Sequence, residues 1–304
     1  MPAGTRVRLG IGDDAAVWRP SRSSLSVITT DALVEDVHFT RDGFTFFQIG
    51  HRALASNLSD IAAMGARPVL ATIALGVPPD VGIEPLMELY EGIQSLAKRT
   101  KTAIAGGDIV RSEKLALSIT IVGEVRPSNL KRRSGARARD VLAVTGELGA
   151  SRAGLDGSGN PEAIAKHRTP EPRLREGRWL AASTSVHAMM DLSDGVAMDL
   201  PRMAAASGLG AIVEVLPISP SAREMAQARN EEARDYALAA GEDFELLVAV
   251  APRAFAHLAD RFQKRFGYAL TAIGTMAEGG GVSMRSGEGT ASLPATGWDH
   301  LARS

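Results

Sequence analysis

Hydrophobic and polar positions recur along the first half of the chain with the periods of strands and helices. Residues 25–31, LSVITTD, are rich in β-branched and apolar side chains and predict a buried strand that ends in hydroxyls and a carboxylate. Residues 44–64 carry apolar side chains near a 3.6-residue period, which predicts a helix that Gly65 and Pro68 end. The same patterns predict further strands at 68–77, 102–108 and 115–125 and a helix at 83–99.

The second half of the chain repeats this alternation after a polar segment. Residues 126–139 are polar and basic and contain Pro and Gly, so they predict a linker, and residues 158–172 predict an exposed loop. Strands are expected at 141–145, 186–190, 211–215, 244–250 and 270–276, with helices at 149–155, 171–182, 194–206 and 253–266. We therefore predict an α/β (α+β) protein of two domains, residues 1–135 and 136–304, with mixed sheets flanked by helices.

Composition narrows the class of protein. With 34 Lys+Arg against 35 Asp+Glu, the net charge gives no electrostatic case for binding nucleic acid or an anionic membrane. The chain has no cysteine, which excludes disulfides, thiolate metal sites and a cysteine nucleophile. The sequence contains no run of about 18 apolar residues, the length that would predict a membrane-spanning helix. The segment MPAGTRVRLGIGDD lacks the apolar region of a signal peptide, so we expect a cytoplasmic protein.

Glycine and aspartate meet repeatedly, in GIGDD (10–14), GGD (106–108), SDG (193–195) and GED (241–243). Backbone that turns tightly beside carboxylates is typical of a site for phosphate and metal. Oxygen-bearing side chains also fall at the predicted ends of elements in the first domain: Asp14, Thr29, Thr30, Asp31, Asp60 and Asp108. Each one alone could simply hydrogen-bond or cap a turn. Together they favour a nucleotide site with several Mg²⁺ ions.

Other motifs restrict the chemistry further. No GxxxxGK[ST] loop occurs, so phosphate binding would depend on metal ions, backbone N–H groups and Arg133, although an arginine in this segment could equally be a solvated linker residue. His38 has no second His or Cys at the spacing of a zinc site, and a lone histidine is more often structural, but it adjoins the proposed site and could donate to a substrate phosphate. His187 lies in an apolar strand, where packing is the simpler role, and no GxSxG elbow is present.

Seven segments in order span essentially the whole chain: GIGDDAAV, TTDALVEDVHF, ALASNLSDIAAMGARP, AIAGGD, RSGARARDVLAVTG, MDLSDGVAMDL and AGEDFELL. This combined pattern closely resembles the thiamine-monophosphate kinase family, within the aminoimidazole ribonucleotide synthetase-like ATP-binding superfamily. The resemblance implies an N-terminal domain that binds ATP and Mg²⁺ and forms a homodimer through its sheet. It implies a C-terminal domain that completes the active site.

The resemblance also implies roles for individual residues. Metal ligands would be Asp14, Thr29, Thr30, Asp31, Asp60, Asp108, Asp191 and Asp194. ATP contacts would be Tyr90, Gly107, Asp108, Arg133 and Ser193, and contacts to thiamine monophosphate would be His38, Glu242 and Trp298. Asp199, one helical turn beyond Asp194, is interpreted as solvated or structural.

The implied reaction is direct in-line transfer of a phosphoryl group from ATP to thiamine monophosphate, giving thiamine diphosphate. No catalytic general base is expected, because the attacking phosphate oxygen is already ionised near neutral pH. Two alternatives stay open: another ATP-using enzyme of the superfamily, such as one similar to aminoimidazole ribonucleotide synthetase, or a non-catalytic nucleotide-binding relative. Selenophosphate synthetases and hydrogenase-maturation relatives would call for a cysteine that this chain lacks.

Overall fold

The computed structural model describes residues 7–9, 17–286 and 289–293. The chain divides into two compact units. Unit 1 comprises Met1–Leu130 with Arg168–Arg178, and unit 2 comprises Lys131–His167 with Trp179–Ser304. Each unit is built on its own sheet.

Unit 1 contains a four-stranded sheet in the order β3-β6-β4-β5, with the strands predicted from the sequence. Only β4 and β5 run parallel, so the sheet is mixed. The strands are β3 (Leu25–Val34), β4 (Arg67–Val77), β5 (Ala103–Arg111) and β6 (Ala116–Val125). The short strands β1 (Val7–Leu9) and β2 (Val17–Trp18) form a separate antiparallel pair.

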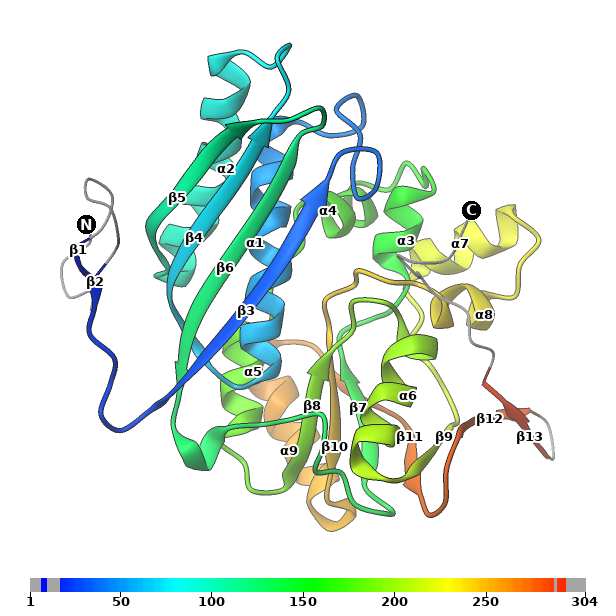
Figure 1. Ribbon diagram of the computed structural model, residues 1–304. Helices are drawn as coiled ribbons and strands as arrows, with labels where there is room; N and C mark the ends of the chain where they lie inside the picture. Colours follow the sequence, from blue (N-terminus) through cyan, green and yellow to red (C-terminus); the bar gives the residue numbers. More distant parts are fainter. Residues whose placement is uncertain (1–6, 10–16, 287–288, 294–304) are drawn as a thin grey trace. The chain divides into compact units, whose positions relative to one another are not determined.

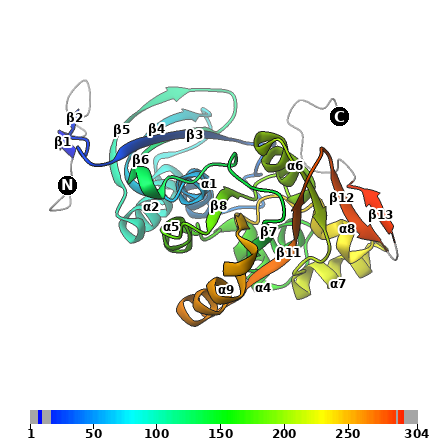
Figure 2. The same ribbon diagram turned by 90° about the horizontal axis from the view of Figure 1, so that it is seen from below.

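Helices α1 (Phe46–Ala63) and α2 (Ile83–Thr100) cover one face of this sheet (Figures 1 and 2). A capping box between Thr45 and Gln48 fixes the start of α1. Glycines let the two helices approach closely, since a Cβ on Gly50 or on Gly92 would lie 2.0 Å from a carbonyl oxygen of the opposite helix. The sequence pattern therefore predicted both helices correctly, but not the role of these glycines at their crossing.

Unit 2 contains a seven-stranded sheet in the order β13-β12-β9-β11-β7-β10-β8, antiparallel except where β12 meets β9. Its strands are β7 (Val141–Thr145), β8 (Val186–Asp191), β9 (Gly210–Val213), β10 (Leu246–Val250), β11 (Leu270–Ala277), β12 (Val282–Ser286) and β13 (Gly289–Ser292). Helix α6 (Val196–Ser207) lies on one face and α9 (Pro252–Phe266) on the other (Figure 2). Fully buried Leu142, Leu200 and Leu247 join the sheet to α6.

The remaining helices are short and were only partly expected. They are α3 (Ala150–Leu155), α4 (Pro161–Arg168), α5 (Leu174–Ala181), α7 (Pro220–Ala228) and α8 (Ala233–Leu238), with a 3₁₀ turn at Pro127–Asn129. The prediction of an exposed loop over 158–172 is wrong, because α4 forms there and buries Ala163 and His167. Helices α7 and α8 and strands β12 and β13 were not predicted. Among the described residues, no helix is long and apolar enough to cross a membrane.

The segment predicted as a linker, 126–139, packs on unit 2 from Lys131 onward. The buried Lys131 donates through Nζ to the carbonyl of Val186 at 2.7 Å, and the Arg132 carbonyl accepts the N–H of Met189 at 3.1 Å. These bonds cover the edge of β8, the last strand of the sheet, whose backbone groups would otherwise lack partners. The linker prediction is therefore wrong for this part of the segment. The expected two-domain α/β architecture with mixed sheets is confirmed.

Candidate active site

In unit 1, the predicted ligands on β3 divide between the two faces of the sheet. Side chains alternate along a strand, so Thr29 and Asp31 face α1 while Thr30 faces the opposite side. Thr29 Oγ1 donates to Asp60 Oδ2 on α1 at 2.5 Å, and the Asp31 N–H donates to Asn57 Oδ1 on α1 at 3.0 Å. The structure thus brings Thr29, Asp31 and Asp60 together.

Thr30 does not join this group. Its hydroxyl donates to the Ile119 carbonyl at 3.2 Å and accepts from Thr120 Oγ1 at 3.1 Å, both on the neighbouring strand β6. Those contacts are what cross-strand hydroxyls ordinarily make. The sheet geometry alone therefore accounts for Thr30, and its assignment as a ligand stays a prediction.

Asp108 and Gly107 lie on β5, three strands away from β3. Asp108 Oδ1 accepts the neighbouring Ile109 N–H at 3.0 Å and lies opposite Ala74 of β4. A Cβ on Gly107 would lie 2.0 Å from the Ile73 carbonyl oxygen, so the close approach of β4 requires glycine there. Neither residue is part of the Thr29–Asp60 group, and their role as ATP contacts stays a prediction.

His38 lies in a turn just after β3. Its Nδ1 accepts the Val34 N–H at 3.1 Å, which leaves Nε2 to carry the proton in the neutral ring. The buried Glu35 fixes the turn by accepting the Leu115 N–H at 2.9 Å and Arg41 Nε at 2.6 Å. Glu35 was not predicted as part of the site, although it lies within the same LVEDVHF segment as His38.

Tyr90, on α2, is half-buried, and burial raises the pKa of its hydroxyl.

In unit 2, Asp191 is the buried last residue of β8 and is followed by the turn Ser193–Gly195. Gly195 has φ 95°, and a Cβ there would lie 2.9 Å from the carbonyl oxygens of Leu238 and Ala240. Asp194 pairs with Arg202 of α6. Arg133 lies beside β8, because the preceding Arg132 carbonyl bonds to Met189, two residues before Asp191. The turn therefore follows the predicted strand end, as expected.

Asp199 is completely buried, so the interpretation of it as solvated is wrong and the structural alternative is confirmed. Its Oδ2 accepts the N–H groups of Ser193 at 3.1 Å and Asp194 at 2.9 Å, and its Oδ1 accepts Arg202 Nη1 at 2.8 Å. Burial raises the pKa of the Asp199 carboxyl to about 6, although the Asp194 N–H group and Arg202 oppose that shift. Asp199 thus holds the backbone of the turn that carries the predicted ATP and metal contacts.

His187 does not simply pack in its strand, as its apolar neighbours suggested. Its Nδ1 lies 2.9 Å from the buried Asp140 carboxylate, which also accepts the Arg137 N–H at 2.8 Å. The role is still a structural one, as expected, but it is carried by a polar contact.

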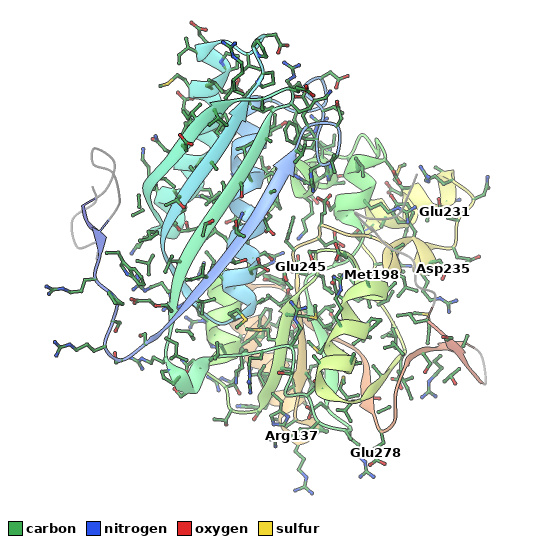
Figure 3. The ribbon with its side chains drawn as sticks, in the orientation of Figure 1. Arg137, Met198, Glu231, Asp235, Glu245 and Glu278 are labelled. Atoms are coloured by element: carbon green, nitrogen blue, oxygen red, sulfur yellow. The ribbon has the colours of Figure 1, made fainter. Side chains whose placement is uncertain are left out.

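The GED segment, Gly241–Asp243, runs against the Ser193 turn. The Glu242 N–H donates to the Ser193 carbonyl at 2.7 Å, and a Cβ on Gly241 would lie 2.8 Å from that same oxygen. The predicted ATP contact Ser193 and the predicted substrate contact Glu242 are therefore neighbours within unit 2. Figure 3 marks Glu245, just beyond this segment at the start of β10, and Met198 on the helix that follows the Ser193 turn.

Two acidic residues beside Glu242 are buried anchors that the sequence analysis missed. Asp243 accepts the N–H groups of Gly149 at 2.6 Å and Ser151 at 3.0 Å. Burial raises the pKa of the Asp243 carboxyl to about 6, against the opposing influence of Lys166 and these N–H groups. Glu245 accepts Thr145 Oγ1 at 2.6 Å. The available signal was the position of both carboxylates within three residues of an apolar strand.

The oxygen donors in unit 1 suit Mg²⁺, a hard cation that prefers carboxylate and hydroxyl ligands and keeps several waters and substrate phosphates. Thr29, Asp31 and Asp60 supply such oxygens on one face of the sheet. No group of three or more His, Cys, Asp or Glu that could hold a metal ion is present in the part of the chain that the structure describes. Asp14 and Trp298 lie outside the described residues.

Comparison with known proteins defines the class. Residues 12–125 match the family "AIR synthase related protein, N-terminal domain", and residues 140–287 match "AIR synthase related protein, C-terminal domain". The two units are therefore those of an AIR synthase-related protein. Over 257 residues the chain is 41% identical to thiamine-monophosphate kinase of Rhodopirellula baltica, covering 81% of this chain and 77% of that protein. The chain belongs to the thiamine-monophosphate kinase family.

Solved structures agree with this assignment. The thiamine-monophosphate kinase from Stenotrophomonas maltophilia K279a is similar with a TM-score of 0.84 and 34% identity, over 93% of this chain and 92% of that one. AaThiL complexed with AMPPCP and TMP is similar with a TM-score of 0.79 and 30% identity, over 96% of this chain and 92% of that one. The resemblance inferred from the sequence motifs and the expected fold are thereby confirmed.

Proposed function

We propose that this protein transfers the γ-phosphoryl group of ATP to thiamine monophosphate, releasing ADP and thiamine diphosphate. The observation that carries the proposal is the similarity over nearly the whole chain to a kinase solved with AMPPCP, an ATP analogue, and TMP. The 41% identity with a curated thiamine-monophosphate kinase supports the same reaction. In this reaction a phosphate oxygen of thiamine monophosphate forms a bond to the γ-phosphorus while the bond to ADP breaks.

The residues divide between three tasks in this proposal. Thr29, Asp31 and Asp60, which meet on one face of the unit 1 sheet, hold Mg²⁺ together with Asp14, Asp108, Asp191 and Asp194, whereas Thr30 on the opposite face is not assigned to this set. Tyr90, Gly107, Asp108, Arg133 and Ser193 contact ATP, and His38, Glu242 and Trp298 contact thiamine monophosphate. When bound, Mg²⁺ ions neutralise the charge of the two phosphorylated substrates and of the oxygens being attacked and released.

The contributions of the protein itself are mainly positioning and hydrogen bonding. The neutral His38 ring carries its proton on Nε2, because Nδ1 accepts the Val34 N–H, and an N–H donor at that atom is suited to a phosphate oxygen. The contacts between Ser193 and Glu242 hold the ATP-binding and acceptor-binding turns of unit 2 in fixed register. No residue needs to act as a general base, since the acceptor phosphate is already ionised near neutral pH.

We also propose that the protein forms a homodimer through the face of the unit 1 sheet that lies opposite α1 and α2. On this face Ile28 is 67% exposed and is flanked by small or hydroxyl-bearing side chains, including Thr30, Ala32 and Ser118. An exposed, largely uncharged sheet face is typical of an association surface. The cytoplasmic location expected from the sequence stays a prediction.

An acceptor panel tests the proposed reaction. Purified protein is incubated with Mg²⁺, ATP and, in separate samples, thiamine, thiamine monophosphate or aminoimidazole ribonucleotide precursors, and ADP and products are measured. The proposal requires ADP and thiamine diphosphate in equal amounts with thiamine monophosphate alone. ADP formed only with another acceptor would assign the chain to a different reaction of the superfamily, and no ADP with any acceptor would favour a non-catalytic relative.

A further inference from the structure

The segment after Gly241 carries three carboxylates that differ in their burial. The Glu242 side chain is 34% exposed, whereas Asp243 and Glu245 are each only 1% exposed. Asp243 is tied to the N–H groups of Gly149 and Ser151 at the start of α3. Of the three carboxylates in this segment, Glu242 is therefore the one whose side chain retains solvent-accessible surface.

The backbone of this segment is strained. Glu242 has φ 63° and Phe244 has φ 49°, both in the left-handed region that non-glycine residues rarely adopt. Such conformations persist only where the surroundings determine them, and they cluster at functional sites. The anchors at Asp243 and Glu245 therefore hold the backbone in a conformation that an unrestrained chain would leave.

Helix α4 supplies further contacts to this segment. Lys166 donates from Nζ to Glu245 Oε1 at 2.5 Å, and the Lys166 side chain is only 16% exposed. The next residue, His167, is buried, with Nδ1 3.2 Å from Ser151 Oγ and 3.9 Å from Glu242 Oε2. Consecutive residues of one helix thus lie against the anchor Glu245 and the half-buried Glu242.

We propose that Lys166 and His167 of α4 are positioning residues for Glu242 and, through it, for the acceptor substrate. Lys166 fixes the segment through Glu245, and His167, held by Ser151, packs beside the Glu242 carboxylate and limits the space in which that carboxylate can lie. The inference rests on the proposed function, because it takes Glu242 as a contact to thiamine monophosphate. It assigns a role to α4, a helix that the sequence pattern did not predict.

The charge arrangement agrees with this role. Burial is the main cause that raises the pKa of the Asp243 carboxyl; Lys166 lowers that pKa and Glu245 raises it, so one cation compensates two neighbouring acids. Breaking a buried pair by removing one partner leaves an uncompensated charge in a low-dielectric site. Loss of Lys166 is therefore expected to release the strained segment rather than leave it in place.

The experiment uses the full chain and compares Lys166→Met with Lys166→Arg, which retains the charge, and with Lys264→Met. Lys264 pairs with Asp260 on the exposed surface of α9 and serves as the matched control. Hydrogen exchange of the peptide that covers residues 240–246 is measured without ligands. Steady-state KM values for thiamine monophosphate and for ATP are measured in parallel.

The proposal predicts faster exchange of residues 240–246 in Lys166→Met and a KM for thiamine monophosphate raised about tenfold or more, because small misplacements of a contact are costly. The KM for ATP should change less than that for thiamine monophosphate. Lys166→Arg should restore both properties toward the wild-type values, and Lys264→Met should leave them unchanged. If Lys166→Met fails to fold, His167→Gln is measured in the same two assays and should raise the same KM.

Unchanged exchange of residues 240–246 would overturn the proposal whatever the activity. Faster exchange with an unaltered KM for thiamine monophosphate would also overturn it, because the segment would then be anchored for stability alone. A wild-type chain that forms no thiamine diphosphate would instead refute the proposed function. The exchange measurement distinguishes these failures, because it requires no substrate.

Discussion

Asp60 and Asp31 reach the same face of the unit 1 sheet from two different elements. Asp60 comes from α1 and accepts the Thr29 hydroxyl, while Asp31 comes from β3 two residues beyond Thr29. Carboxylate oxygens are ligands that Mg²⁺ prefers. The proposed function assigns both carboxylates to the metal, so it predicts that their charge is needed for turnover.

Asp60→Asn provides the test at this position. The amide oxygen of asparagine can still accept the Thr29 hydroxyl, so the fold should be retained, but the charge that attracts Mg²⁺ is lost. We expect turnover to fall by at least about a hundredfold, with an unchanged circular dichroism spectrum. Asp31→Asn should behave alike, and Asp260→Asn on the surface of α9 is the control. Near-normal turnover in both Asp60→Asn and Asp31→Asn would show that these residues do not hold the metal.

The buried Asp243 makes stability depend on pH in a particular direction. Its pKa in the folded chain is about 6, above the ordinary value of 3.8, so between these values the folded state binds more protons than the unfolded state. Stability from this group is present below pH 4 and is lost as the pH rises through about 6. The loss is on the order of 3 kcal/mol at 1.36 kcal/mol per pKa unit.

Asp243→Asn isolates this effect, because asparagine does not titrate. The free energy of unfolding in urea is measured for the variant and the wild type between pH 4 and pH 7. We expect the wild type to lose stability relative to the variant across that range, whatever the constant offset between them. A stability difference between wild type and variant that does not change with pH would show that the pKa of Asp243 is not raised.

At the scale of elements, the crossing of α1 and α2 depends on two glycines. A Cβ at Gly50 would lie 2.0 Å from the Leu89 carbonyl oxygen, which is closer than real contacts allow. Gly50→Ala should therefore force the helices apart and lower the free energy of unfolding by about 1–3 kcal/mol or more. Gly280→Ala is the matched control, since no atom lies within 4 Å of a Cβ built there. Equal stability of the two variants would contradict the tight crossing.

The long elements were predictable from sequence because their periodicity is strong. β3, β4, β6, α1 and α2 all appear close to the expected positions. The missed helices α4, α7 and α8 are only six to nine residues long, so any apolar stripe along them is too short to recognise. Their stability comes from tertiary contacts, such as those of Lys166 and Tyr236, which the sequence pattern does not contain.

The site was predictable in its residue types but less so in its supporting contacts. Ser193 and Glu242 stand out beside glycines, and the structure places them together. Asp199 was interpreted as solvated or structural, and its anchoring role was missed because its chief partners are main-chain N–H groups, which no sequence motif marks. Lys166 lies 79 residues from Glu245, and only the fold brings such a pair together.

At the scale of the whole molecule, the proposed homodimer depends on the face of the unit 1 sheet that lies opposite α1 and α2. Ile28→Glu would place a charge on the proposed dimer surface and should convert the protein to a monomer. Ile83→Glu, at a similarly exposed isoleucine on α2, is the control and should leave the dimer intact. Light scattering during size-exclusion chromatography gives the mass directly. A monomeric wild type, or a dimer in Ile28→Glu, would contradict the proposed interface.

The central claim is direct transfer from ATP to thiamine monophosphate on this chain. It is tested most directly by following the label from ATP labelled at the γ-phosphate, with Mg²⁺ and thiamine monophosphate present. We predict that the label appears in the terminal phosphate of thiamine diphosphate, with none bound covalently to the protein during turnover. Label retained on the protein, or released as inorganic phosphate without thiamine diphosphate, would contradict this account.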